Sequence, residues 1–282
     1  MDIRLERSIR PGAALYGIGL IGFGIVGLVR LDAVPAIEPV SAAFPLRPLL
    51  AVVSAAVLIG AGGLLAAGRQ TLRAAIGAAS FLFFLLVSLH VPHLSAHPLN
   101  GGAWVGAFEV LAISSAGWLL AATIMLDQTA DSPQSNLWRR VAVGARLAFS
   151  ICLIAFGLSH FVYHQYVESV IPAWMPAHRF WTYGIAICFL AAGMSLATRI
   201  KPNLSATLLA IMFGSWVVLV HAPRTVGHSP NANEWTSLLV AVAMSGGSWI
   251  VSVCVAARNH DAANAGVAAT GTHAKRHQLA SS

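Results

Sequence analysis

Charged residues are scarce in this chain of 282 residues. Asp, Glu, Lys and Arg together make up 10% of the sequence, whereas soluble domains carry roughly 25%. A surface that faces water on all sides cannot be built from so few charges, so a soluble globular protein is excluded. Hydrophobic residues instead reach 57%, and the mean hydropathy is +0.74. The composition therefore indicates a protein whose surface faces lipid.

Cysteine is equally scarce, and its placement excludes two kinds of site. Cys152, Cys188 and Cys254 are the only three cysteines, and no two of them have the C-x-x-C spacing of a redox or zinc motif. The sequence also contains no HExxH motif. It therefore predicts no metal site, and we interpret the three thiols as small packing residues.

Eight apolar stretches account for the hydrophobic content. A helix needs about 20 apolar residues to cross about 30 Å of hydrocarbon, and each stretch comes close to that length. Their continuous runs of Leu, Ala and Gly lack the alternation of a β-barrel strand. We therefore predict an all-α integral membrane protein with eight transmembrane helices. The predicted spans are residues 13–31, 48–67, 74–91, 103–126, 141–164, 180–198, 204–222 and 235–256.

The second half of the chain repeats the first. At an offset of 131 residues the His-x-Pro sequence at 90–92 falls on the one at 221–223. Such a repeat indicates a tandem duplication, and four spans per unit give two parallel four-helix repeats. Further coinciding pairs are His97/His228, Asn100/Asn231, Trp104/Trp235 and Trp118/Trp249. The predicted domains are an N-terminal repeat (1–126), a cytoplasmic linker (127–139), a C-terminal repeat (140–257) and a disordered cytoplasmic tail (258–282).

The distribution of Lys and Arg predicts the orientation. With the N-terminus inside, thirteen of the 17 basic residues fall on the inner side. This bias places both termini in the cytoplasm and the protein in the inner (cytoplasmic) membrane. The net charge of +7 then reflects topology and contact with the lipid bilayer, and no nucleic-acid partner is expected. The four basic residues on the outer side are Arg30, Arg47, Arg179 and Arg224.

Candidate functional residues gather toward the predicted outer side. Glu109 lies about two turns inside the fourth span, where a carboxyl group is costly and usually faces a partner or a cavity. His160 and His164 share one helix face of the fifth span, and His221 ends the seventh. Imidazoles so placed can relay protons, hydrogen-bond a quinone carbonyl, or bind a metal or haem. The alternatives are an interfacial belt of histidines and a protonated Glu109 bonded between helices.

Three motifs follow one another in the second repeat. A Gly-x-x-His-Phe sequence ends its first helix, a Pro-x-Trp-x-Pro loop follows, and a His-x-Pro sequence closes its third helix. Their residues are Gly157, His160, Phe161, Pro172, Trp174, Pro176, His221 and Pro223. Over about residues 145–255 this pattern resembles the DoxX-like family of small four-helix membrane proteins. The resemblance implies the four-helix fold, with roles in that family that range from quinone-coupled redox subunits to assembly helpers.

The first repeat matches this pattern only in part. Gly27 stands at the position of His160, and Ala43 stands at that of Trp174. The helix at 183–196 also lacks the Glu that many family members carry. We therefore expect one working pocket, in the second repeat, where His160 and His221 face one cavity under the loop 170–179.

Two functions of different classes fit these features. In the first, the protein is a quinone-linked redox subunit, and a protein partner in a membrane redox complex supplies electrons because the sequence has no flavin, haem or C-x-x-C motif. In the second, it is a non-catalytic scaffold, an assembly factor or a small-solute permease. Quinone, haem or metal that co-purifies with the protein would distinguish the first from the second. In the first function, the quinone oxygens are bound and its protons transferred by His160, His221 and Glu109. The cofactor is further bound by His164, Trp174 and Arg224.

Overall fold

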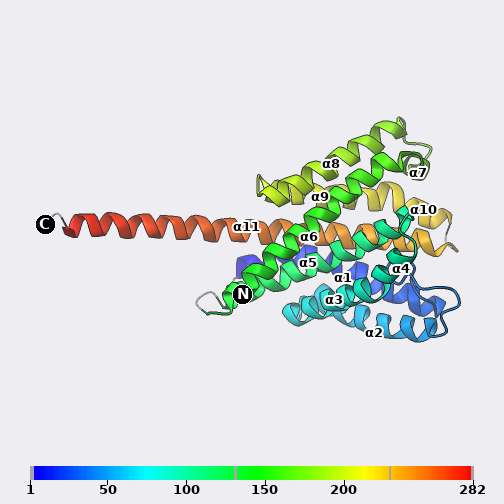
Figure 1. Ribbon diagram of the computed structural model, residues 1–282, viewed down its shortest axis with the longest axis horizontal. Helices are drawn as coiled ribbons and strands as arrows, with labels where there is room; N and C mark the ends of the chain where they lie inside the picture. The colour runs from blue at the N-terminus through cyan, green and yellow to red at the C-terminus, as the bar shows by residue number, and fades with distance from the viewer. Residues whose placement is uncertain (1–2, 130–131, 229, 281–282) are drawn as a thin grey trace.

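The computed structural model describes residues 3–129, 132–228 and 230–280, with side chains as far as Arg258. In these residues every regular element is a helix, and eight helices are long and apolar enough to cross a membrane. The prediction of an all-α multi-pass membrane protein is therefore confirmed (Figure 1). The elements are α1 (Ile3–Arg30), α2 (Arg47–Ala66), α3 (Thr71–Leu85), η1 (Leu86–His90), α4 (Val91–Ala96), α5 (Gly101–Gln128), α6 (Ser135–Val162), α7 (His164–Val170), α8 (His178–Thr198), α9 (Pro202–Trp216), η2 (Val217–His221), α10 (Ala222–Gly227) and α11 (Ala232–Ala280).

The starts of several helices follow from single residues. α2 and α9 both have a proline in their first turn, Pro48 and Pro202. Proline suits this position because the N–H that it lacks would have no partner inside the helix. α5 begins after Asn100, whose side chain accepts a hydrogen bond from the backbone N–H of Ala103 at 3.2 Å.

The third span of each half runs further than the sequence predicted and contains a π-helical segment. The apolar stretches predicted ends at 91 and 222, directly before Pro92 and Pro223, but the helices continue to Ala96 and Gly227. The wider turns of η1 and η2 come directly before the prolines, and such turns accommodate a ring that would clash with the preceding turn of an α-helix. His90 and His221 are the last residues of the two π segments. The π turn therefore fixes the position of each imidazole.

The structure repeats at the same offset as the sequence. α3, η1 and α4 are matched residue for residue by α9, η2 and α10. Hydrogen bonds repeat as well: the Ser114 hydroxyl donates to the Ala79 carbonyl at 2.8 Å, and the Ser245 hydroxyl donates to the Ala210 carbonyl at 2.9 Å. In Figure 1 corresponding helices of the two halves run toward the same end of the bundle. The two halves thus share one helical plan in one direction.

The two halves interlock. α1 packs against α2 and against α11, the last span of the other half, while α6 packs against α8 and α5. α5 and α11 also contact each other. The helices therefore form two rings of five that share the central pair α5 and α11. One hydrophobic cluster of buried residues extends through both rings.

Small residues allow close approach at the centre of this arrangement. Gly17 of α1 lies against the backbone of Gly62 in α2, and a methyl group at Gly246 of α11 would collide with the backbone of Tyr16 in α1. Tyr16 is fully buried, and its hydroxyl donates to the Ile113 carbonyl of α5 at 2.8 Å. Close contact between small residues is the usual way in which membrane helices gain packing energy. α1, α5 and α11 are thus joined at one point.

The two ends of the bundle differ. The beginning of α1 lies at the same end as the end of α5 and the beginning of α6, whereas α4, α7 and α10 lie at the opposite end (Figure 1). We call the latter the histidine end and the former the arginine end. The histidine end carries His90, His93, His97, His160, His164, His178, His221 and His228.

Two segments differ from the predicted bounds. α1 begins at Ile3 rather than at residue 13, because its polar first turns lie outside the apolar stretch but continue the helix. The composition beyond residue 258 predicted disorder, whereas the backbone continues α11 as a helix to Ala280, away from the bundle (Figure 1). This segment is rich in Ala, which has the highest helix propensity.

Candidate functional site

His221 has a buried nitrogen without a partner. Its Nδ1 finds no hydrogen bond among the described residues. An unpaired buried polar atom costs about 1–3 kcal/mol, so such an atom marks a place where a ligand or water can bond. Its counterpart His90 is 2% exposed, and its Nε2 lies 3.3 Å from the carbonyl oxygen of Ile37. The unpaired nitrogen therefore distinguishes the second half from the first.

His160 lies in the last turns of α6, beside an aromatic cluster. Its Nδ1 is 2.8 Å from the Phe156 carbonyl oxygen, so Nδ1 carries the proton and Nε2 is an acceptor. The imidazole meets the ring of Phe189 in α8 edge-on, with centroids 5.3 Å apart. Phe189 in turn lies 5.6 Å from Phe213 of α9. The aromatic cluster (Phe156, Phe189 and Phe213) thus connects His160 to the span that contains His221.

Arg224 and Glu234 form a bidentate ion pair at the histidine end. Nε and Nη2 of Arg224 donate to the two carboxylate oxygens of Glu234 at 2.9 and 2.6 Å. Nη1 donates to the Val170 carbonyl at 3.1 Å. The ion pair therefore joins α10 to α11 and ties both to the end of α7. Arg224, predicted to bind a cofactor, is engaged with groups of the protein through all three of its nitrogens.

His164 and Trp174 belong to the connection between α6 and α8. Nδ1 of His164 lies 3.3 Å from Oε1 of Glu168, one turn further along α7. Trp174 is 63% exposed, and the buried residues of its loop are Ile171 and Met175. An exposed indole at the end of a span is typical of an interfacial anchor.

Glu109 is half-buried on α5. No hydrogen bond or ion pair joins it to another residue whose side chain is described. Two turns further along the same face of α5, Ala116 lies against Gly247 of α11. Glu109 therefore lies on the side of α5 that is turned toward α11, at the contact between the two halves.

The first half contains a buried acid that the sequence analysis missed. Glu38 lies in the loop 31–46 between α1 and α2 and is 1% exposed. Its carboxylate accepts hydrogen bonds from the backbone N–H of Val34, at 2.8 Å, and from the hydroxyl of Ser54. Burial raises the pKa of Glu38 above its ordinary value. The only sign in the sequence is an acid among the apolar and proline residues of this loop, six residues after Asp32.

A second anchor holds the same loop. Nε and Nη2 of Arg47 donate to the two carboxylate oxygens of Asp32 at 2.5 and 2.9 Å, and Nη1 donates to the Val40 and Ser41 carbonyls. The guanidinium of Arg47 lowers the pKa of Asp32. The loop therefore has a fixed course across the histidine end.

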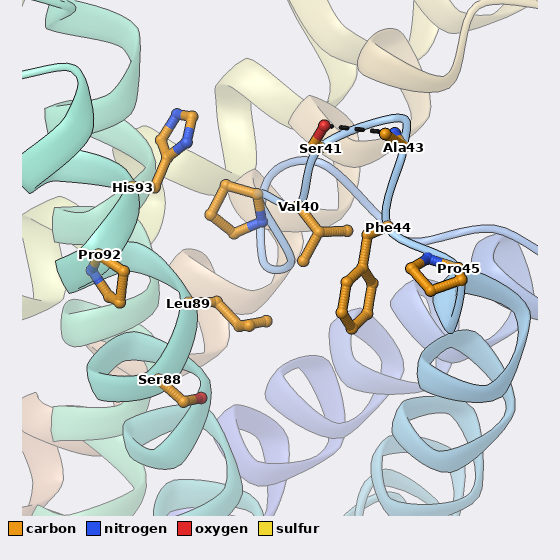
Figure 2. A pocket seen from close by; sticks show the side chains of 10 residues that line it. Val40, Ser41, Ala43, Phe44, Pro45, Ser88, Leu89, Pro92 and His93 are labelled. Atoms are coloured by element: carbon orange, nitrogen blue, oxygen red, sulfur yellow. Dashed lines mark hydrogen bonds between the residues drawn. The ribbon is translucent and has the colours of Figure 1, made fainter.

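An open hollow of about 550 Å³ lies between this loop and the end of the third span. One wall is formed by residues 39–45, and the other by residues 88–93. Figure 2 shows Phe44 and Leu89 facing each other across it, with His93 and Ser41 at one end. The sequence led us to expect a pocket under the loop 170–179, and this hollow occupies the corresponding place in the first half.

Neither a metal cluster nor a known relative points to a function. Among the residues with described side chains, no three His, Cys, Asp or Glu side chains gather closely enough to hold a metal ion. No protein-family model matches the chain, and no curated protein or solved structure matches it. The function therefore has to be inferred from the residues of this chain.

Proposed function

We propose that this multi-pass membrane protein is a DoxX-like subunit of a membrane redox complex and binds a quinone at the histidine end of its second half. The arginine end lies in the cytoplasm, and the protein resides in the cytoplasmic membrane. The motif residues Gly157, His160 and Trp174 support the DoxX-like relation. The eight membrane-spanning helices favour a ligand that dissolves in lipid.

The unpaired Nδ1 of His221 carries this proposal. A neutral imidazole can donate a hydrogen bond to a quinone carbonyl or accept one from a hydroquinone hydroxyl, according to its tautomer. In apolar surroundings either bond is stronger than in water. The quinone headgroup therefore satisfies a nitrogen that the protein leaves without a partner.

In this proposal His160 forms a hydrogen bond with the other end of the quinone headgroup. Its Nδ1 is held by the Phe156 carbonyl, so its Nε2 accepts a hydrogen bond from a hydroquinone hydroxyl. The rings of Phe189 and Phe213 suit a flat aromatic headgroup, because aromatic rings attract each other in offset or edge-on geometry. The site thus combines two polar ends with an aromatic wall.

The remaining predicted residues have supporting roles in this proposal. Glu109 supplies a further proton-accepting group on α5. Arg224 holds α7, α10 and α11 together through its bonds to Glu234 and Val170. His164 contacts Glu168 within α7, and Trp174 anchors the loop at the interface. A bound quinone would carry electrons and protons to or from the membrane. A partner protein supplies or takes up the electrons, because the sequence has no motif for a second redox group.

Binding of a short-chain quinone to the full-length protein tests the proposal. The protein in lipid nanodiscs is titrated with decylubiquinone, and quenching of tryptophan fluorescence reports binding. His160→Ala and His221→Ala each weaken binding about tenfold, since each removes one hydrogen bond of about 1.4 kcal/mol. His97→Ala, an exposed histidine at the same end, leaves binding unchanged. Absence of saturable binding to the wild type, or equal binding by all variants, would overturn the proposal and favour a non-catalytic scaffold.

A further inference from the structure

The hollow of the first half has a fixed wall. The loop 31–46 is held to α2 by two contacts, the Asp32–Arg47 ion pair and the hydrogen bond from Ser54 to Glu38, and within the loop Glu38 also bonds to Val34. The opposite wall is the end of the third span, where helix hydrogen bonds hold the backbone. Because both walls are held by the fold itself, the hollow does not depend on a flexible segment.

Two lining positions of the hollow have small side chains where the second half has larger ones. Ala43 in the first half corresponds to Trp174, and Ser88 corresponds to Leu219. Ala43 and Ser88 are thus two lining positions at which a larger side chain, such as the one in the second half, would take up space in the hollow.

The lining is polar at one end and apolar below it. His93 and Ser41 lie at one end of the hollow in Figure 2, with Phe44 and Leu89 next to them. The deeper Ser88 has its hydroxyl bonded to the Phe84 carbonyl at 2.6 Å. No Asp, Glu, Lys or Arg is among the described residues that line the hollow. This lining suits an uncharged amphipathic segment with its polar end toward the histidine end of the bundle.

The hollow is continuous with the lipid-facing surface. Phe83, Phe84 and Val87, on the span that forms one wall, are 47%, 61% and 52% exposed. Exposed apolar side chains on a membrane span face acyl chains. The volume of the hollow lies within the range of about 300–1,000 Å³ that is usual for small-molecule sites. A molecule in the adjacent leaflet therefore reaches the hollow from the bilayer.

We propose that the hollow binds one phospholipid of the leaflet at the histidine end. The first part of an acyl chain lies between Phe44 and Leu89. The ester region lies at the level of His93 and Ser41, whose N–H and O–H groups donate to its carbonyl oxygens. This site is separate from the proposed quinone site in the second half, and neither depends on the other.

Photocrosslinking in nanodiscs tests the lipid site. The wild-type protein is reconstituted in phosphatidylcholine that contains a fraction with a diazirine near the ester end of one acyl chain, and labelled peptides are mapped by mass spectrometry. Residues 39–45 and 88–93 should be labelled severalfold more than the corresponding segments 170–176 and 219–224. Equal labelling of the two halves would mean that the lipid contacts the protein surface non-specifically, and would overturn the proposal.

Variants that fill the hollow provide the decisive control. Ala43→Trp and Ser88→Leu introduce the residues of the second half, and each should reduce labelling at 39–45 and 88–93 severalfold. The matched controls Ala42→Trp and Ser95→Leu place the same side chains at exposed positions outside the lining and should leave labelling unchanged.

Three results would overturn the proposal. The first is undiminished labelling in whichever filled variants retain the thermal unfolding midpoint of the wild type. The second is an equal loss of labelling in the controls. The third is displacement of the lipid by decylubiquinone, which would assign the hollow to the quinone instead.

Discussion

The two halves of this protein have the same helices but different histidine ends. In the first half the loop 31–46 buries Glu38, His90 bonds to a loop carbonyl, and a hollow remains. In the second half an Arg224–Glu234 ion pair ties the elements together, and His221 keeps a nitrogen unpaired. The spans cannot change without disturbing a shared core, whereas the loops at the end are free to diverge. The two halves thus share the arrangement of membrane-spanning helices and differ in the loops and side chains at the histidine end.

A second comparison concerns the two contacts between the halves. α1 meets α11 through Gly12, Gly19, Gly22 and Gly246. In the first span of each repeat a gap of two residues makes the offset 133. The positions that correspond to these four in α6 and α5 therefore carry Ala145, Cys152, Ala155 and Ser115. The contact of α1 with α11 is therefore built for closer approach than the contact of α5 with α6.

The largest effect is expected where this approach is closest. Gly246→Ser introduces the residue that α5 has at position 115, and its side chain collides with the backbone of Tyr16. We expect a loss of about 3 kcal/mol in the free energy of unfolding, because overpacking forces the backbone to shift. The reverse change Ser115→Gly costs about 1 kcal/mol or less. Unfolding in mixed micelles with increasing SDS measures both, and equal losses would contradict the difference between the two contacts.

The ion pair of the second half should have the next largest effect. Arg224→Ala leaves Glu234, whose side chain is 12% exposed, without its partner. We expect a loss of roughly 2–3 kcal/mol, since an unpaired buried charge is costly. The double variant Arg224→His with Glu234→Ala recreates His93 and Ala103 of the first half and should recover most of that loss. A double variant no more stable than Arg224→Ala would contradict this, in the same unfolding measurement.

Glu38 should make the stability fall with rising pH, a trend that Ser169, the corresponding residue of the second half, cannot produce. Its pKa is raised in the folded state, so the folded protein holds a proton that the unfolded chain releases above about pH 4.3. Stability therefore falls as pH rises from there to the folded pKa, by about 1.4 kcal/mol for each unit of the shift. The difference in stability between the wild type and Glu38→Gln should shrink or reverse over that range. Ser169→Ala, at the corresponding position of the second half, should show no such trend.

The smallest expected effect concerns the paired histidines. His90→Ala removes a buried side chain with a hydrogen bond to Ile37, and we expect a loss of about 1 kcal/mol. His221→Ala removes a nitrogen that has no partner among the described residues, so its effect on unfolding should be smaller. Thermal unfolding midpoints in nanodiscs without quinone compare the two. A greater loss for His221→Ala would show that its nitrogen is paired within the fold.

The sequence predicted some features of the candidate site and missed others. His160 and His221 were placed at one end because both lie near the ends of odd-numbered spans, and depth depends only on position along a helix. Glu38 was missed because its burial depends on how a loop folds back between α1 and α2. The engagement of Arg224 with Glu234 was also missed, since ten residues and a turn separate them.

The sequence by itself determined the all-helical membrane fold, the eight spans and the repeated order of elements. These features depend on apolar length and on the backbone's need for internal hydrogen bonds in lipid, and both are local properties of each segment. Only the tertiary structure decided that α1 packs against α11, that His90 is bonded while His221 is not, and that the hollow lies in the first half. In a duplicated chain the first span of each repeat can pack against the last span of either repeat. The choice depends on side-chain volumes that meet across the fold, far apart in the sequence.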